Sequence, residues 1–128
     1  MSAADQVDGP AAGAPALTAA AILERGTAPP QPLYVAEWGG TVYVREMSGA
    51  ERDAFELSCS AGGKPSLANL RARLAVRTLC DAEGKRLFRD DQADELGRQS
   101  GRALDKIADF AAELNAINQT DVQALAGN

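Results

Sequence analysis

EWGGTVYVREMSGAER, residues 37–52, joins a predicted β-hairpin to a predicted helix start and decides the fold class. Apolar and polar residues alternate over residues 33–47, as they do in strands with one buried face. Gly39 and Gly40 interrupt this alternation, and glycine readily adopts the positive φ angles that a two-residue hairpin turn requires. This register predicts three facing pairs: Trp38 with Thr41, Ala36 with Tyr43, and Val35 with Val44.

The two faces of the predicted hairpin differ in composition. We expect the aliphatic face to pack on the core; it carries Leu33, Val35, Val42 and Val44. The opposite face carries Tyr34, Ala36, Trp38, Thr41 and Tyr43. Aromatic residues make up only 5% of the chain, so their concentration on a predicted solvent face is unusual. This face is therefore a candidate contact surface for another protein.

Helix-start signals predict much of the remaining structure. Ser48 and Glu51 form an S-x-x-E capping box, which predicts a helix over residues 49–59. We expect this helix to bury Ala54 and Phe55. Further helices are predicted over residues 17–25, from Pro65 to Thr78, from Asp90 or Asp91 to Gly97, and from Ser100 through Ile117.

Residues 79–88, LCDAEGKRLF, predict a second short hairpin with Gly84 in the left-handed conformation. The last helix carries an apolar stripe at 4-3-4-3 spacing: Ala103, Ile107, Phe110, Leu114 and Ile117.

These elements predict an α+β fold, in which a small N-terminal β-hairpin and a second short hairpin pack with about four to five α-helices. Residues 17–118 are expected to form a single domain. Residues 1–16 are rich in Ala, Gly and Pro, so we expect a disordered tail there. Residues 119–128 are expected to form a flexible C-terminal tail.

Composition argues against several classes of function. The chain has 128 residues and a net charge of −5, whereas a nucleic-acid-binding protein needs a basic face. Histidine, the usual general base and a common metal ligand, is absent from the sequence. Cys59 and Cys80 lack CxxC spacing and are expected to be small buried thiols. No membrane-spanning run or signal-peptide pattern is evident, so we expect a soluble cytoplasmic protein.

Local motifs give no enzyme or metal site. In residues 81–92, DAEGKRLFRDDQ, the carboxylates and the glycine do not fit the register of a calcium loop. Gly62-Gly63-Lys64 precedes proline and follows no strand, unlike a phosphate-binding loop. We therefore predict no catalytic, cofactor or metal site. Three arginines, at positions 71, 73 and 77, are expected on a solvated helix face, with an acidic partner helix as the alternative.

The order of these motifs resembles the tail assembly chaperones of long-tailed phages and prophages. An Ala-rich N-terminal helix precedes EWGGTVYVREMSGAERDAFE. A middle helix enters LCDAEGKRLFRDDQADELGRQS, and an amphipathic helix ends in ELNAIN. The resemblance covers roughly residues 17–118.

The resemblance implies a non-enzymatic protein without cofactors that binds the tape measure protein, keeps it soluble and helps to recruit tail tube subunits. It implies a protein of the host cytoplasm that is absent from the mature virion. Self-association is left open, and nucleic-acid and membrane partners are not expected. A structural head–tail or tail-completion subunit is the alternative.

A chaperone for a helical client needs apolar surface together with net charge that keeps the complex soluble. We predict that Trp38, Tyr43 and Tyr34 contact the partner and that Arg45 lies on the polar rim. The stripe of the last helix is the alternative contact surface, although a domain this short is expected to need that stripe for its core.

Overall fold

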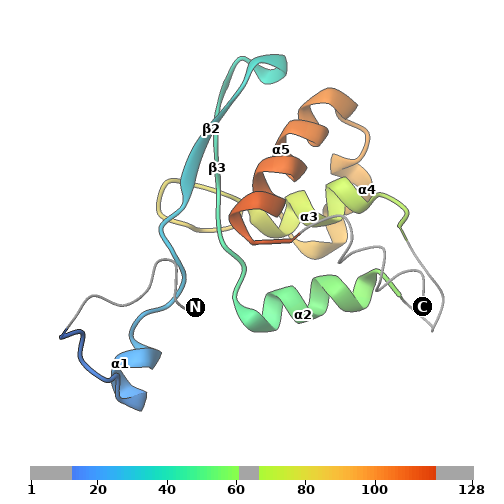
Figure 1. Cartoon of the computed structure of the whole chain (residues 1–128). Helices are drawn as coiled ribbons and strands as arrows, with labels where there is room; N and C mark the ends of the chain where they lie inside the picture. Colours follow the sequence, from blue (N-terminus) through green and yellow to red (C-terminus); the bar gives the residue numbers. More distant parts are fainter. Residues whose placement is uncertain (1–12, 61–66, 118–128) are drawn as a thin grey trace.

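The computed structural model describes residues 13–60 and 67–117, and it confirms the predicted α+β fold (Figure 1). In chain order the elements are α1 (Ala19–Leu23), β2 (Gln31–Val35), the 3-10 helix η1 (Ala36–Trp38), β3 (Gly40–Val44), α2 (Gly49–Ser58), α3 (Leu70–Thr78), β4 (Leu79–Cys80), the 3-10 helix η3 (Asp90–Gln92), α4 (Ala93–Leu96) and α5 (Gly101–Leu114). Most of the predicted N-terminal tail and all of the predicted C-terminal tail, residues 119–128, lie outside the described residues.

The sheet is antiparallel and has the strand order β2-β3-β4. Its third strand comes from the second predicted hairpin, because β4 pairs with β3 through Val44 opposite Leu79. Cys80 also bridges to Arg86 across a turn in which Gly84 has a φ of 87°. The second hairpin is therefore confirmed, and it extends the first one into a single sheet.

The predicted two-residue turn of the first hairpin is wrong. Val35 pairs with Gly40, and η1 occupies the loop between them. The loop closes with a 3.1 Å hydrogen bond from the Gly39 N–H to the Ala36 carbonyl. Only Gly39 needs a left-handed conformation, with a φ of 65°, so Gly40 is free to pair in β3.

The three predicted facing pairs are consequently wrong, since β2 is displaced by four positions relative to β3. A displacement by an even number of residues keeps every side chain on its face. The predicted aliphatic face is accordingly retained, with Val35 and Val44 fully buried.

The capping box of α2 is present. The Glu51 N–H donates to Ser48 Oγ at 3.2 Å, and the Ser48 N–H donates to Glu51 Oε1 at 2.8 Å. Phe55 is buried as expected, but Ala54 is exposed because it lies on the outer side of α2.

The helix predicted from Pro65 begins later, at Leu70. Asn69 has a left-handed φ of 54°, which a right-handed helix cannot include, so Leu67 precedes α3. The predicted start itself, Pro65, lies outside the described residues.

Neither Asp90 nor Asp91 caps α4, because both lie in η3 and Gln92 precedes α4 instead. Gly97 ends α4 as predicted. Ser100 caps α5, with its Oγ accepting from the Ala103 N–H at 3.1 Å.

The core lies where the inner face of the sheet meets α2, α3 and α5. Its largest fully buried apolar side chains include Phe55, Leu79, Ile107, Val35 and Val44. The predicted stripe of α5 mostly faces this core, although Phe110 and Leu114 are half-buried. In contrast, α1 buries no side chain and lies apart from the main body (Figure 1). No helix in the described part of the chain is long and apolar enough to cross a membrane.

Candidate protein-binding surfaces

The outer face of the hairpin brings together two of the four predicted contact residues. Tyr34 pairs with Thr41, and Tyr43 pairs with Pro32, so both tyrosines lie on the face opposite Val35. Tyr34 is 61% exposed, whereas Tyr43, on the central strand, is half-buried. This tyrosine face is the part of the predicted aromatic surface that the strands themselves position.

Trp38 does not continue the tyrosine face, because it lies in η1 rather than on a strand. It is 36% exposed and lines a surface cavity of about 350 Å³ with Phe88 and Leu96. The hairpin tip is also attached to α5 by an ion pair of 3.2 Å between Glu37 and Lys106. The Glu37 carboxylate accepts a hydrogen bond from the backbone N–H of its own residue, and this bond and the Lys106 ammonium both lower the pKa of the carboxyl group.

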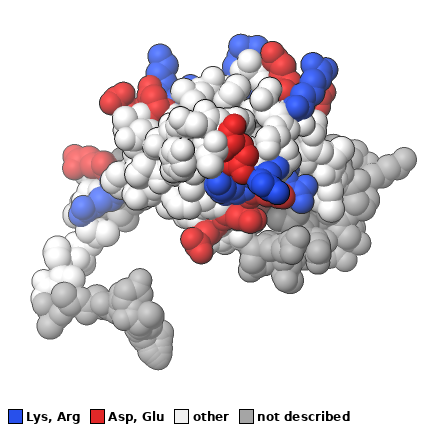
Figure 2. All heavy atoms as spheres, turned by 90° about the horizontal axis from the view of Figure 1, so that it is seen from above, with Lys and Arg blue, Asp and Glu red and all other residues white. Residues whose placement is uncertain are grey.

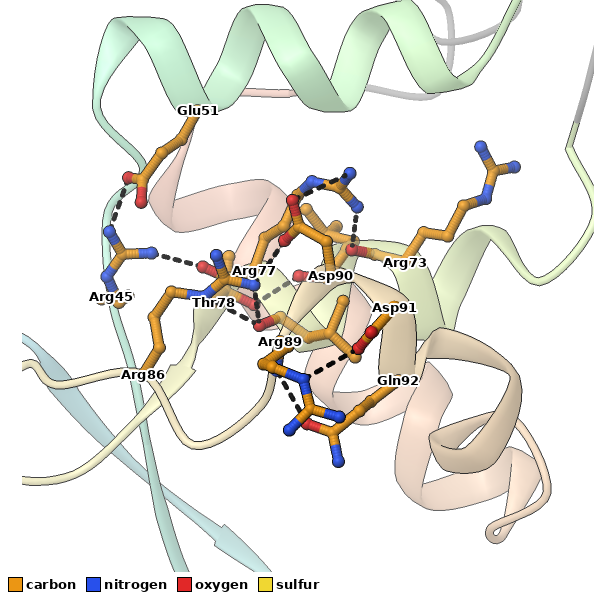
Figure 3. Close-up of polar contacts among 12 residues, drawn as sticks. Arg45, Glu51, Arg73, Arg77, Thr78, Arg86, Arg89, Asp90, Asp91 and Gln92 are labelled. Carbon is orange, nitrogen blue, oxygen red and sulfur yellow. Dashed lines mark hydrogen bonds and ion pairs between the residues drawn. The ribbon is translucent and has the colours of Figure 1, made fainter. Parts of the chain in front are cut away.

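The guanidinium group of Arg45 forms its polar contacts within the molecule. Its side chain is 14% exposed, and one guanidinium nitrogen lies 2.5 Å from Glu51 Oε1. Another donates to the carbonyl oxygen of Arg77 (Figure 3). Burial raises the pKa of Glu51, but hydrogen bonds from the Ser48 N–H and from Arg45 outweigh it, so the pKa is lowered. Of the four predicted contact residues, Arg45 is the one most fully used by internal contacts.

The prediction that three arginines lie on a solvated helix face is wrong for two of them. Arg73 donates to the Ser58 carbonyl at 2.7 Å. Arg77 is buried, with its guanidinium carbon 5.8 Å from the centroid of the Phe55 ring. The third, Arg71, is exposed and pairs with Asp105 of α5, so its acidic partner is in the same chain.

Arg77 and Arg86 converge on Asp90 (Figure 3). Arg86 donates to Asp90 Oδ1 at 2.6 Å and to the Val76 carbonyl at 2.8 Å. The hydrogen bond from Arg86 lowers the pKa of Asp90, and burial lowers the pKa of Arg77. This cluster attaches the segment before α4 to α3, which is a structural role.

A groove between α3 and α5 was not predicted from the sequence. It has a volume of about 580 Å³. Its apolar lining includes Phe55, Leu67, Leu70, Leu74, Ala108, Ala112 and Ile117, and its charged lining consists of Arg71, Asp105, Asp109 and Glu113. The sequence does contain a signal for this groove. Ala108 and Ala112 lie four residues apart, and acidic residues at the same spacing lie beside them.

No group of three or more metal-ligating side chains is present in residues 13–60 and 67–117. Cys59 and Cys80 are free and buried, as expected. Burial raises the pKa of the Cys80 thiol, which disfavours the reactive thiolate. Figure 2 shows basic and acidic side chains interspersed over one face of the molecule. The apolar surfaces are therefore the better candidates for a functional site.

Comparison with known proteins identifies one family. A model of phage tail assembly chaperones matches residues 20–126. The chain is also similar in fold to the solved structure of the bacteriophage HK97 tail assembly chaperone, with a TM-score of 0.51 and 19% sequence identity. The similarity covers 66% of this chain and 83% of that chain. Comparison with curated protein sequences gives no match.

Proposed function

The chain belongs to the phage tail assembly chaperone family, and on this basis we propose that it binds the tape measure protein, keeps that protein soluble and helps to recruit tail tube subunits. The single observation that carries the proposal is the exposed tyrosine face, with Trp38 beside it at the hairpin tip. Exposed aromatic side chains supply large contact areas at low entropic cost, which suits the apolar stripe of a helical client. In this proposal the protein acts by binding alone, in the host cytoplasm, and is absent from the finished particle.

Two features support a role in binding rather than catalysis. The carboxyl groups with lowered pKa values, such as Glu51 and Asp90, belong to ion pairs that join elements of the fold. The net charge of −5 favours solubility of a complex with an apolar client.

The test is co-expression with the tape measure protein encoded in the same genome. Tyr34→Ala and Trp38→Ala are the primary variants, because both side chains are exposed and their removal leaves the core intact. We expect each to reduce co-purified tape measure protein several-fold, since aromatic side chains dominate binding energy in many interfaces. Tyr43→Ala is a third variant, whose folding is checked by circular dichroism because the residue is half-buried.

Leu57→Ala is the matched control. Leu57 is 70% exposed on α2, away from the hairpin, so this variant also removes exposed apolar surface. Wild-type yields of tape measure protein for folded variants at positions 34, 38 and 43 would contradict the proposed contact surface.

Mass spectrometry of purified particles separates this proposal from a structural head–tail or tail-completion subunit. The chaperone proposal requires that the protein be missing from particles and present in lysates of infected or induced cells. Stoichiometric protein in the particle would support the structural alternative.

A further inference from the structure

The groove between α3 and α5 is a second apolar surface, separate from the hairpin. Its floor includes Leu70 and Leu74 of α3 and the buried ring of Phe55. Leu67, which also lines the groove, is 45% exposed. These side chains give the groove an aliphatic and aromatic lining, in which Leu67 is exposed whereas Leu74 and Phe55 are buried.

Small side chains on α5 leave the groove unfilled. Ala108 and Ala112 lie four residues apart on one side of α5, and both are half-buried. An alanine pair at this spacing permits the close approach of another backbone, as small residues do at helix–helix contacts.

One wall of the groove is acidic. Asp105, Asp109 and Glu113 follow one another at intervals of four residues along α5. From the rise of 1.5 Å per residue, this row is about 12 Å long, or roughly two helical turns. Asp105 pairs with Arg71, but within the described parts of the chain neither Asp109 nor Glu113 forms an ion pair.

From this geometry we propose that the groove binds an amphipathic helix of a partner protein, with the apolar stripe of that helix on the groove floor and lysine or arginine side chains along α5. The two carboxylates without ion pairs specify the charge of the partner, and the alanine pair accommodates its backbone. Identification of the partner as the tape measure protein rests on the proposed function. The binding mode itself depends only on the groove.

The experiment uses the full-length protein and two fluorescently labelled synthetic peptides of about 18 residues, long enough to cover the groove as a helix. Both peptides carry the same leucine stripe at helical spacing. One has lysine and the other has glutamate on the flanks of the stripe. Fluorescence anisotropy measures the dissociation constant of each peptide at low and at physiological salt.

We expect the lysine peptide to bind at least about fivefold more tightly than the glutamate peptide, with the difference falling as salt rises. The double variant Asp109→Lys/Glu113→Lys should abolish or reverse this preference. Both side chains are exposed, so the substitutions do not disturb the core. The matched control, Glu24→Lys/Asp53→Lys, changes the net charge equally at two exposed positions outside the groove.

Three outcomes would overturn the proposal. The first is an equal effect of both double variants, which would indicate non-specific attraction to the acidic protein. The second is that neither peptide binds to the protein. The third is a change of oligomeric state in light scattering when only Asp109 and Glu113 are replaced, without a change in peptide binding, which would assign the groove to a second copy of the chain.

The two proposals fail independently. Loss or reversal of the preference for the lysine peptide in the groove variant, together with wild-type co-purification of tape measure protein by the hairpin variants, would support the groove and contradict the hairpin. The reverse pattern would support the hairpin and contradict the groove.

Discussion

Asn115 is the residue whose replacement tests the fold most directly. This asparagine follows α5 and is only 6% exposed. Its Oδ1 accepts from the Met47 N–H at 2.7 Å, and its Nδ2 donates to the Ala111 carbonyl at 2.9 Å. One amide group therefore joins the end of α5 to the segment that connects β3 with α2.

The cost of Asn115→Ala follows from which groups lose their partners. The Ala111 carbonyl keeps the backbone N–H of residue 115 at 3.0 Å. The Met47 N–H, in contrast, is left buried without its acceptor, which costs about 1–3 kcal/mol. The two hydrogen bonds from Nδ2, to the Ala111 carbonyl and at 3.4 Å to the Arg45 carbonyl, add about 1 kcal/mol together. We therefore expect the free energy of unfolding to fall by about 3 kcal/mol.

Urea denaturation followed by far-UV circular dichroism and by the fluorescence of Trp38 measures this change. A loss of about 3 kcal/mol corresponds to a midpoint lower by about 2 M urea, with the slope unchanged. Gln99→Ala, which removes an amide from an exposed side chain, is the control and should change stability by less than about 0.5 kcal/mol. A loss below about 1 kcal/mol for Asn115→Ala would refute the reasoning, because the Met47 N–H would then have another partner.

Two further perturbations test packing and charge. A Cβ on Gly97 would lie 2.5 Å from Oδ1 of Asn69, so Gly97→Ala should destabilise the fold by about 1 kcal/mol in thermal or urea unfolding. Gly101→Ala, which meets no atom within 4 Å, should be neutral or slightly stabilising, and equal effects of the two would contradict this account. Because the fold lowers the pKa values of Glu51 and Asp90 from 4.5 and 3.8, their stabilisation is present above about pH 4.5 and is lost as the pH falls below it. Unfolding free energies measured from pH 7 to pH 3 should show this loss, and Glu51→Gln should flatten the profile; an unchanged profile in that variant would exclude Glu51 as a contributor.

Features set by neighbouring residues could be predicted from the sequence. The capping box at Ser48 and the cap at Ser100 depend only on a side chain and the N–H group three residues on. The aliphatic face of the hairpin was also predictable, since it depends only on alternation. That alternation remains correct although the predicted two-residue turn is two residues shorter than the observed loop, which spans residues 36–39.

Features set by distant residues could not be predicted. The 3-10 turn is favoured by the attachment of Glu37 to Lys106, which lies 69 residues away. The burial of Arg77 depends on Phe55 and Asp90, neither of which adjoins it in sequence. The groove depends on the packing of α3 against α5, and a sequence pattern can show an alanine pair without showing what faces it.

The two candidate surfaces lie on different sides of α5, and this restricts how a client can bind. Lys106 points toward the hairpin tip through its ion pair with Glu37, whereas Ala108 lines the groove. A step of two residues along a helix rotates the side-chain direction by about 200°, so Lys106 and Ala108 point in nearly opposite directions. A single short helix cannot reach both surfaces across the roughly 10 Å diameter of α5. If both surfaces bind, one chain must engage two client segments or one segment from each of two clients. Linked engagement of two weak sites raises the overall affinity through effective concentration. A long helical client offers many such segments, so modest affinity at each surface is sufficient for the proposed role.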